Sequence, residues 1–267
     1  MSAKSYDKES ATALELADWA SRRIRHARPS AVTTKMHDAD LVTDTDREIE
    51  RHVRAVIEDR FPDHAVVGEE FGGEPAKGGG PTWYVDPVDG TTNYASGLPW
   101  CSFSLALADG DGPAVGVVAD PFRSEVFSAV RGGPATCNGV PVHCRDATDL
   151  AGEVVVTEWA SFRPWPGMDV LLERLSAQHC TARIMGSSAL SLVSVAAGRA
   201  AAGVIGEFNP IDVLAAVFIA ARAGAVVRAE DGTSTLFPAA GGIAVAAPGV
   251  ADALWKAWVP AMAARSC

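Results

Sequence analysis

The chain has 267 residues, of which 48% are hydrophobic and 21% are charged, and its formal net charge is −10. This balance is typical of a folded globular protein with a hydrophobic core and excludes an intrinsically disordered chain. The acidic excess repels nucleic-acid phosphates, so we expect no nucleic-acid partner. A phosphorylated substrate would be repelled in the same way unless a bound cation stood between the two negative charges.

The sequence predicts no targeting or membrane-spanning segment. Lys4, Asp7, Lys8 and Glu9 place charges where a signal sequence would have an apolar core. The longest apolar run, 213–221, is too short to cross a bilayer. We therefore expect a cytoplasmic protein without a membrane partner. The five dispersed cysteines include no Cys-x-x-Cys pair, which argues against a zinc site or a disulfide framework.

In the first half of the chain, two predicted helices precede a series of strands. Apolar residues recur at helical spacing over 9–25, and a second helix is predicted from Thr45 to the Phe61-Pro62 breaker. We expect a glycine-rich loop over 72–81 and a hairpin turn at Asn138-Gly139. Residues of high β-propensity predict strands at 64–68, 83–85, 102–108, 116–119 and 126–130.

Strand and helix signals alternate from about residue 150 onward. Predicted strands lie at 154–157, 182–185, 201–205, 225–228 and 243–247. Predicted helices lie at 169–178, 188–197 and 212–223, and a last helix carries Trp255 and Trp258. This alternation indicates a layered α/β (α+β) fold in which helices cover sheets. We expect an N-terminal half, 1–147, and a C-terminal half, 148–267, that share an interface.

The segment 83–93, WYVDPVDGTTN, carries the most informative pattern in the chain. A short apolar strand presents Asp86 and Asp89 at its C-terminal end. Gly90 permits a tight turn, and Thr91 can begin a helix whose free amides attract an oxyanion. Two carboxylates beside such amides would repel a phosphate unless a divalent cation lay between them. The segment therefore predicts metal ligands and a phosphate-binding turn in one place.

Three further acidic segments could each be explained alone as a helix cap or a solvated turn. Glu69 and Glu70 end a strand, and only one of them should reach a shared site because successive strand side chains point to opposite faces. Residues 40–46 precede the second helix, and Asp212 opens an apolar helix. Mg²⁺ prefers oxygen ligands, so these segments together predict a magnesium site. The expected ligands are Glu69, Asp86, Asp89 and Asp212.

The segment 86–93, DPVDGTTN, resembles the signature of the inositol monophosphatase family. The acids in 40–46, the Gly-Glu-Glu at 68–70 and Asp212 follow in the family's order, and 183–189, RIMGSSA, resembles another family segment. The resemblance covers roughly residues 10–260. It implies an αβαβα sandwich of the inositol monophosphatase/fructose-bisphosphatase type, a homodimer, and a lithium-sensitive Mg²⁺-dependent phosphatase.

The resemblance also implies roles for individual residues. A first Mg²⁺ ion would be bound by Glu69, Asp86 and the carbonyl of Val88. A second would be bound by Asp86, Asp89 and Asp212. A third, weaker ion would use Glu69 and water, and Mn²⁺ could substitute for Mg²⁺. Hydrolysis would then proceed by direct attack of a metal-activated water, without a covalent phosphoenzyme.

Catalytic and substrate contacts follow from the same resemblance. Asp46 and Thr91 would orient and deprotonate the attacking water, with Glu69 as a further catalytic residue. The amides of Gly90 and Thr91 would hold the phosphate. The implied substrate contacts are Asp89, Gly186, Ser187, Ser188 and Glu207.

The chain departs from the family at positions near the substrate. Ile211 stands where the family usually has Trp, and 222–225, RAGA, replaces Glu-Ala-Gly-Gly. Glu207 is closer to Asp212 than the acidic residue that helps to hold inositol in relatives. We therefore expect intact metal ligands and an altered substrate pocket. The substrate is left open among inositol, histidinol, sugar, aminocyclitol and nucleotide 3′-phosphates.

Two other interpretations stay open. Asp44-Thr45-Asp46 suggests a haloacid-dehalogenase-type phosphatase, although that chemistry needs Thr or Val where Glu48 stands. The second is a regulatory or accessory protein that kept the fold and lost the chemistry, against which the complete acidic set argues. Lys35 is predicted on a mobile flap near the metals, with an ordinary solvated lysine as the alternative.

Overall fold

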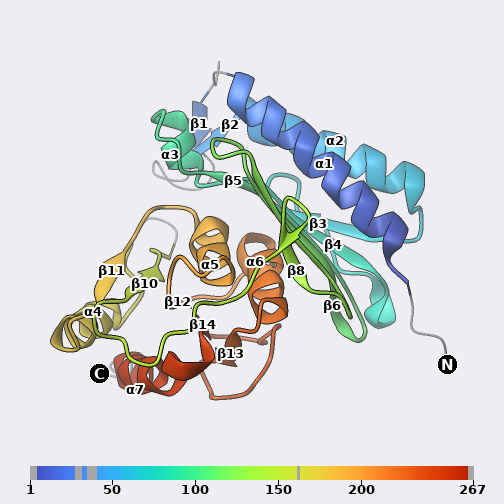
Figure 1. Cartoon of the computed structure of the whole chain (residues 1–267). Coiled ribbons are helices and arrows are strands. Elements are labelled where there is room, and N and C mark those ends of the chain that lie inside the picture. Colours follow the sequence, from blue (N-terminus) through green and yellow to red (C-terminus); the bar gives the residue numbers. More distant parts are fainter. Residues whose placement is uncertain (1–4, 28–31, 35–40, 161–162, 264–267) are drawn as a thin grey trace.

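The computed structural model of the chain describes residues 5–27, 32–34, 41–160 and 163–263. Its helices and two main sheets stack in alternating layers, helix, sheet, helix, sheet and helix (Figure 1). This arrangement confirms the predicted αβαβα sandwich. None of the helices in the described segments is long and apolar enough to cross a membrane.

The larger sheet begins with a parallel pair and continues antiparallel. In spatial order its strands are β3 (Ala65–Gly68), β4 (Thr82–Asp89), β5 (Ser102–Asp109), β6 (Gly112–Asp120), β7 (Glu125–Val130), β8 (Ala135–Cys137) and β9 (Val140–Pro141). Two helices, α1 (Asp7–His26) and α2 (Asp44–Arg60), cover one face of it (Figure 1). The apolar stripe of α1 at Leu16, Ala20 and Ile24 is buried there, as the helical spacing predicts.

The middle layer consists of α5 (Ser188–Ala196) and α6 (Pro210–Arg222). Helix α6 packs on β4, β5 and β6 of the larger sheet and on β13 and β14 of the smaller one. Residues 213–220 are all buried as a result. A helix that is apolar on every side needs such a place between two sheets.

The smaller sheet is mixed and comes from the second half of the chain. Its spatial order is β11 (Thr181–Arg183), β10 (Val154–Thr157), β12 (Ala202–Ile205), β14 (Ile243–Ala246) and β13 (Val226–Ala229), of which the first three are parallel. The outer helices are α4 (Met168–Ala177) and α7 (Ala251–Ala263) (Figure 1). The two sheets fall on either side of residue 147, but the division into two halves stays a prediction.

The predicted strands and long helices are present, with shifts at their ends and some additions. Helix α2 begins at Asp44 instead of Thr45, because the Thr43 side chain accepts the amide of Asp46 while the Asp46 carboxylate accepts that of Thr43. The strand expected over 182–185 ends at Arg183. Unpredicted short elements are β1 (Val32–Thr34), β2 (Leu41–Thr43), β8, β9, and the single-turn helices η1 (Lys77–Gly79) and η2 (Pro248–Val250).

Candidate functional site

Strand β4 ends in a bulge that brings two acidic side chains together. Asp86 pairs with Ser104 of β5 and Asp89 with Ser102, so two residues of β4 oppose one residue of β5. Pro87, which has no amide proton for the ladder, lies in this bulge. Residues three apart on a regular strand point to opposite faces, and the extra residue restores Asp89 to the side of Asp86. The bulge is the reason that both carboxylates can serve one site.

Asp86 is the most crowded carboxyl group of the site. It is 4% exposed, and burial raises its pKa well above the usual range. Three neighbouring carboxylates raise that pKa further: Glu69, Asp89 and Asp212. Glu69 follows β3, which is parallel to β4, and its side chain hydrogen-bonds to Asp86. The structure therefore brings together all four predicted metal-binding carboxylates, the fourth of them, Asp212, from the first turn of α6.

This donor set fits a hard divalent cation. Four mutually repelling carboxylates are stabilised by positive charge, and oxygen is the ligand atom that Mg²⁺ prefers. Within the described part of the chain, no three His, Cys, Asp or Glu side chains are arranged so that they could hold a metal ion as they stand. Mg²⁺ typically keeps several water and phosphate oxygens among its ligands.

Asp46 and Thr91 lie together beside the carboxylates. The Thr91 hydroxyl is 3.2 Å from Asp46 Oδ1 and 2.9 Å from the carbonyl oxygen of Val88, and it can donate to either. Burial raises the pKa of Asp46 to about 6, although hydrogen bonds from Thr43 lower it. A carboxylate with such a pKa can accept a proton near neutral pH. The two residues predicted to activate water are thus in contact with each other.

Asp89 is held mainly by donors from the second half of the chain. Its Oδ2 accepts the hydroxyls of Ser102 (3.1 Å) and Ser187 and the amide of Ala189 (3.0 Å), while Oδ1 accepts the amide of Ser188 (3.1 Å). Ser187 is the N-cap of α5. Burial raises the pKa of Asp89 to about 6, and these hydrogen bonds oppose the rise.

The turn after Asp89 has no room for a side chain. Gly90 has a φ of 91°, and a Cβ there would lie 2.7 Å from the carbonyl oxygen of Gly186 and 3.1 Å from that of Trp100. Thr91 follows at the start of α3 (Thr91–Ala95), whose first internal bond runs from the Tyr94 amide to Gly90. The preceding amides have no acceptor inside this helix and can bind an oxyanion.

Other predicted residues lie elsewhere or make different contacts. Glu207 is exposed in the turn between β12 and α6. The polar groups of Ser187 and Ser188 face Asp89, so their predicted contact with substrate stays a prediction. Lys35 and Asp40 lie outside the described residues.

The haloacid-dehalogenase alternative does not fit the local structure. Asp44, Thr45 and Asp46 form the first turn of α2, and the Asp46 carboxylate caps that helix. Asp44 therefore lies on a helix, and the chain has the αβαβα fold instead. Residues missed from the sequence include Asn93 and Glu158, which bind the loop before α5. Glu158 follows the apolar strand β10, as Asp86 follows the apolar residues 83–85, and that shared pattern could have found it.

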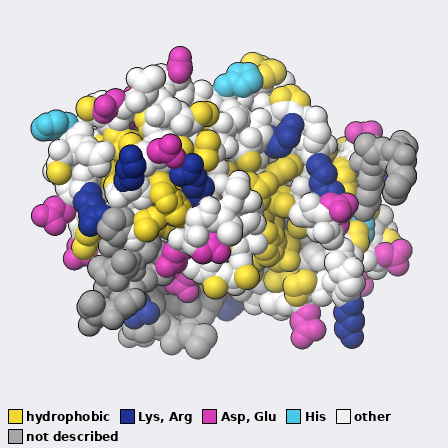
Figure 2. Space-filling model, turned by 90° about the horizontal axis from the view of Figure 1, so that it is seen from below, with side chains coloured by type: hydrophobic (Ala, Val, Ile, Leu, Met, Phe, Trp, Pro, Cys, Tyr) yellow, Lys and Arg dark blue, Asp and Glu magenta, His cyan; other side chains and the backbone are white. Residues whose placement is uncertain are grey.

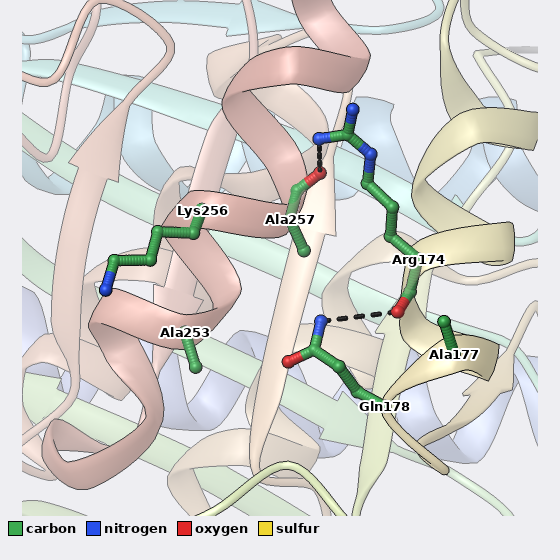
Figure 3. Close-up of a pocket in the computed structure, with 6 residues that line it drawn as sticks. All are labelled: Arg174, Ala177, Gln178, Ala253, Lys256 and Ala257. Atoms are coloured by element: carbon green, nitrogen blue, oxygen red, sulfur yellow. Dashed lines mark hydrogen bonds between the residues drawn. The ribbon is translucent and has the colours of Figure 1, made fainter.

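A cavity of about 470 Å³ lies away from these carboxylates, between α4 and α7 (Figure 3). It is lined by Arg174, Ala177, Gln178, Ala253, Lys256 and Ala257. The Arg174 guanidinium donates to a carbonyl oxygen of α7, and the Gln178 side-chain amide donates to a carbonyl oxygen of α4. None of these lining residues is acidic, whereas the predicted metal-binding carboxylates gather around Asp86.

Known proteins resemble this chain in sequence and in structure. A sequence profile described as the inositol monophosphatase family matches residues 5–261. The inositol monophosphatase of Mesembryanthemum crystallinum is 35% identical over 72% of this chain and 74% of that protein. Nus factor SuhB of Pasteurella multocida is 39% identical over 62% of this chain and 63% of that protein, less than two thirds of its length. The solved Thermotoga maritima IMPase has a TM-score of 0.86 at 27% identity, over 96% of this chain and 98% of that one.

Proposed function

Because the chain belongs to the inositol monophosphatase family, we propose that it hydrolyses a small phosphate monoester with the help of Mg²⁺. The observation that carries this proposal is the buried crowding of carboxylates around Asp86. Such crowding destabilises a metal-free protein, and a divalent cation would relieve it. The groups that would hold the ions are Glu69, Asp86, Asp89, Asp212 and the carbonyl oxygen of Val88.

In this mechanism the protein positions a water molecule and holds the phosphate. When bound, the metal ions would acidify the attacking water and stabilise the leaving oxygen. Thr91 would donate its hydroxyl proton to the Asp46 carboxylate and accept a proton from the water, so that one proton moves from the water to Asp46. The amides of Gly90 and Thr91 would bind the phosphate oxygens.

The two departures from the family sequence have different consequences. Arg222 donates through Nε to the carbonyl of Gly133 at 2.6 Å, in the turn between β7 and β8. It is ten residues beyond Asp212, about 15 Å along α6, so its role is to anchor the far end of that helix. Ile211 is half-buried next to Asp212, and its side chain, smaller than the Trp usual in the family, would leave more space for a substrate there. We propose that the substrate is an inositol-like, sugar, aminocyclitol or histidinol phosphate.

Purified protein tests this proposal directly. We expect Mg²⁺-dependent release of phosphate from at least one member of a panel of these monoesters, loss of release with a chelator, and recovery with Mn²⁺. A folded protein that released phosphate from no member of the panel would contradict the proposal. Size-exclusion chromatography with light scattering would test the predicted homodimer.

A regulatory role is the second candidate, because relatives include proteins named Nus factor SuhB. On the face shown in Figure 2, Lys and Arg side chains are interspersed with Asp and Glu, and no continuous basic surface is visible there. The carboxylates around Asp86 support catalysis, since binding alone would not require four acids that repel one another. Full regulatory function in a variant without phosphatase activity would favour this second role.

A further inference from the structure

One buried carboxylate near the site has no part in the proposed mechanism. Glu158 follows β10 and is 3% exposed. Its oxygens accept the amides of Met185 (3.1 Å) and Gly186 (2.7 Å) and the hydroxyl of Ser191 (2.5 Å). Within the described part of the chain, no Lys or Arg forms an ion pair with it. These three neutral donors therefore stabilise its buried position.

The contacts of Glu158 enclose the residues that hold Asp89. Glu158 binds 185–186 on one side and Ser191, in the first turns of α5, on the other. The donors between these points, in 187–189, are the ones that bind Asp89. Movement of this loop would therefore turn the Asp89 carboxylate.

A second residue fixes the same loop from the first half of the chain. Asn93 Nδ2 donates to the carbonyl oxygens of Met185 (2.7 Å) and Trp100 (2.8 Å). The amide of Met185 binds Glu158 while its carbonyl binds Asn93, so the residue is held from both sides. A Cβ on Gly186 would lie 2.8 Å from Asn93 Nδ2, which shows how closely the loop and α3 pack.

The hydrogen bonds also distinguish the two oxygens of Asp89. Among the described residues, Oδ2 accepts three donors, whereas Oδ1 accepts only the Ser188 amide. A carboxylate oxygen has two lone pairs, so Oδ1 is the oxygen with a direction left for a cation. The orientation set by 187–189 decides whether that direction faces Asp86 and Asp212.

We propose that Glu158 is a positioning residue that fixes 185–191 and thereby orients Asp89 Oδ1 toward the bound cation. This proposal rests on the proposed function, because it assigns Asp89 as a metal ligand. Groups that orient metal ligands typically change metal affinity by about 10–100-fold when they are removed. Because Glu158 acts on Asp89 through the loop, we expect an effect at the lower end, about tenfold.

The test compares Glu158→Gln with Glu153→Gln. Glu153 precedes β10 and pairs with Arg145 at 3.0 Å, so the control makes the same substitution at the opposite end of the same strand. Amide hydrogen exchange of the metal-free protein and Mn²⁺ binding are measured for both variants. We expect Glu158→Gln to lose protection over 185–191 while α6 stays protected, and to bind Mn²⁺ about tenfold more weakly. Glu153→Gln should match the wild type in both measurements.

The outcomes separate this proposal from the proposed function. If the wild type binds Mn²⁺ and Glu158→Gln binds it equally well, the positioning role is overturned and the proposed function stands. Unchanged exchange over 185–191 overturns the positioning role as well. A wild type that binds no Mn²⁺ overturns both.

A second pair of variants serves if Glu158→Gln does not fold. Ser191→Ala removes one donor to Glu158, and Ser194→Ala removes a buried hydroxyl that donates to the Ser191 carbonyl in the same helix. Ser191→Ala should weaken Mn²⁺ binding by a smaller factor and loosen 185–189, whereas Ser194→Ala should not. Equal behaviour of these two serine variants contradicts the proposal.

Discussion

The two halves of the molecule contribute different chemistry to the site. The first half supplies most of the negative charge, from strand ends and the first turn of α2: Asp46, Glu69, Asp86 and Asp89. The second half supplies Asp212 and neutral donors from the start of α5, the hydroxyl of Ser187 and the amides of 188–189. The comparison indicates that charge and its orientation come from separate parts of the chain.

Each half also holds its part of the site with a buried glutamate, and the two differ in charge balance. Glu50 of α2 accepts the amides of Glu70 (2.6 Å) and Phe71 (3.2 Å) and pairs with Arg54 at 2.8 Å. Glu158 has neutral donors only among its described partners, and burial raises its pKa to about 7. Both glutamates thus bind two consecutive loop amides, Glu50 with Arg54 as a counter-ion and Glu158 without one among its described partners.

The largest expected effect is that of Asp86→Asn, which tests whether the first half supplies the essential charge. Loss of this ligand should forfeit several kcal/mol of charge stabilisation and lower phosphate release by about a thousandfold or more. The same variant should unfold at a higher temperature than the wild type when metal is absent, because a neutral amide relieves the repulsion around it. Phosphate release and thermal unfolding with a chelator are the measurements.

Asp63→Asn is the control for this variant, since Asp63 is exposed in the turn after α2. It should change neither measurement. Ordinary activity of Asp86→Asn would refute the assignment of the site to the end of β4.

The next effect concerns pH and the buried Glu158 of the second half. From about pH 4.5 to about pH 7 an unfolded glutamate has lost its proton while Glu158 in the native state keeps it. The native state then binds more protons, so this group makes the free energy of unfolding fall as pH rises, by about 3 kcal/mol over the range. In Glu158→Gln, this contribution to the decrease in the free energy of unfolding should be absent.

Urea unfolding of the metal-free protein across this pH range measures the slope. Asp46, Asp86 and Asp89 also have raised pKa values and add to the slope in both proteins, so the comparison is the difference between wild type and variant. Identical slopes would show that Glu158 is ionised across this range and that burial does not raise its pKa.

Gly186→Ala should have a smaller effect, on the contact between the halves. Gly186 has a φ of 88°, and the added methyl group would press on Asn93 at 2.8 Å. We expect a loss of about 2–3 kcal/mol in the free energy of unfolding. Gly224→Ala is the control, because its φ of 96° carries a similar backbone cost and nothing lies within 4 Å of its Cβ. Equal destabilisation of both variants in urea would mean that the close contact between loop and α3 adds nothing.

The acidic residues at strand ends could be predicted because their signals are local. An apolar strand followed by Asp, Pro and Gly defines the end of β4 within eleven residues, 83–93. The burial of α6 on all sides likewise follows from its continuous apolar sequence. These patterns were sufficient to predict the layered fold and to predict that the main carboxylates share one site.

Contacts between distant segments could not be predicted in the same way. Ser187 to Ala189 are about a hundred residues from Asp89, and their contact depends on how α5 docks between the sheets. The helix-capping propensity of Ser187 correctly indicates the N-cap of α5. It does not indicate which carboxylate the Ser187 side chain binds. Strands of three residues, such as β1, are too short to show a period-two pattern.

The smallest effect that we predict is that of Glu50→Gln, which completes the comparison of the two glutamates. The neutral amide weakens the hydrogen bonds to Glu70 and Phe71 and leaves Arg54 without its ion pair, at a cost of about 1–2 kcal/mol. Glu48→Gln is the matched control in the same helix, because the half-exposed pair of Glu48 with Arg23 should contribute at most about 1 kcal/mol. A cost no larger than that of Glu48→Gln would show that the buried contacts of Glu50 add nothing to stability.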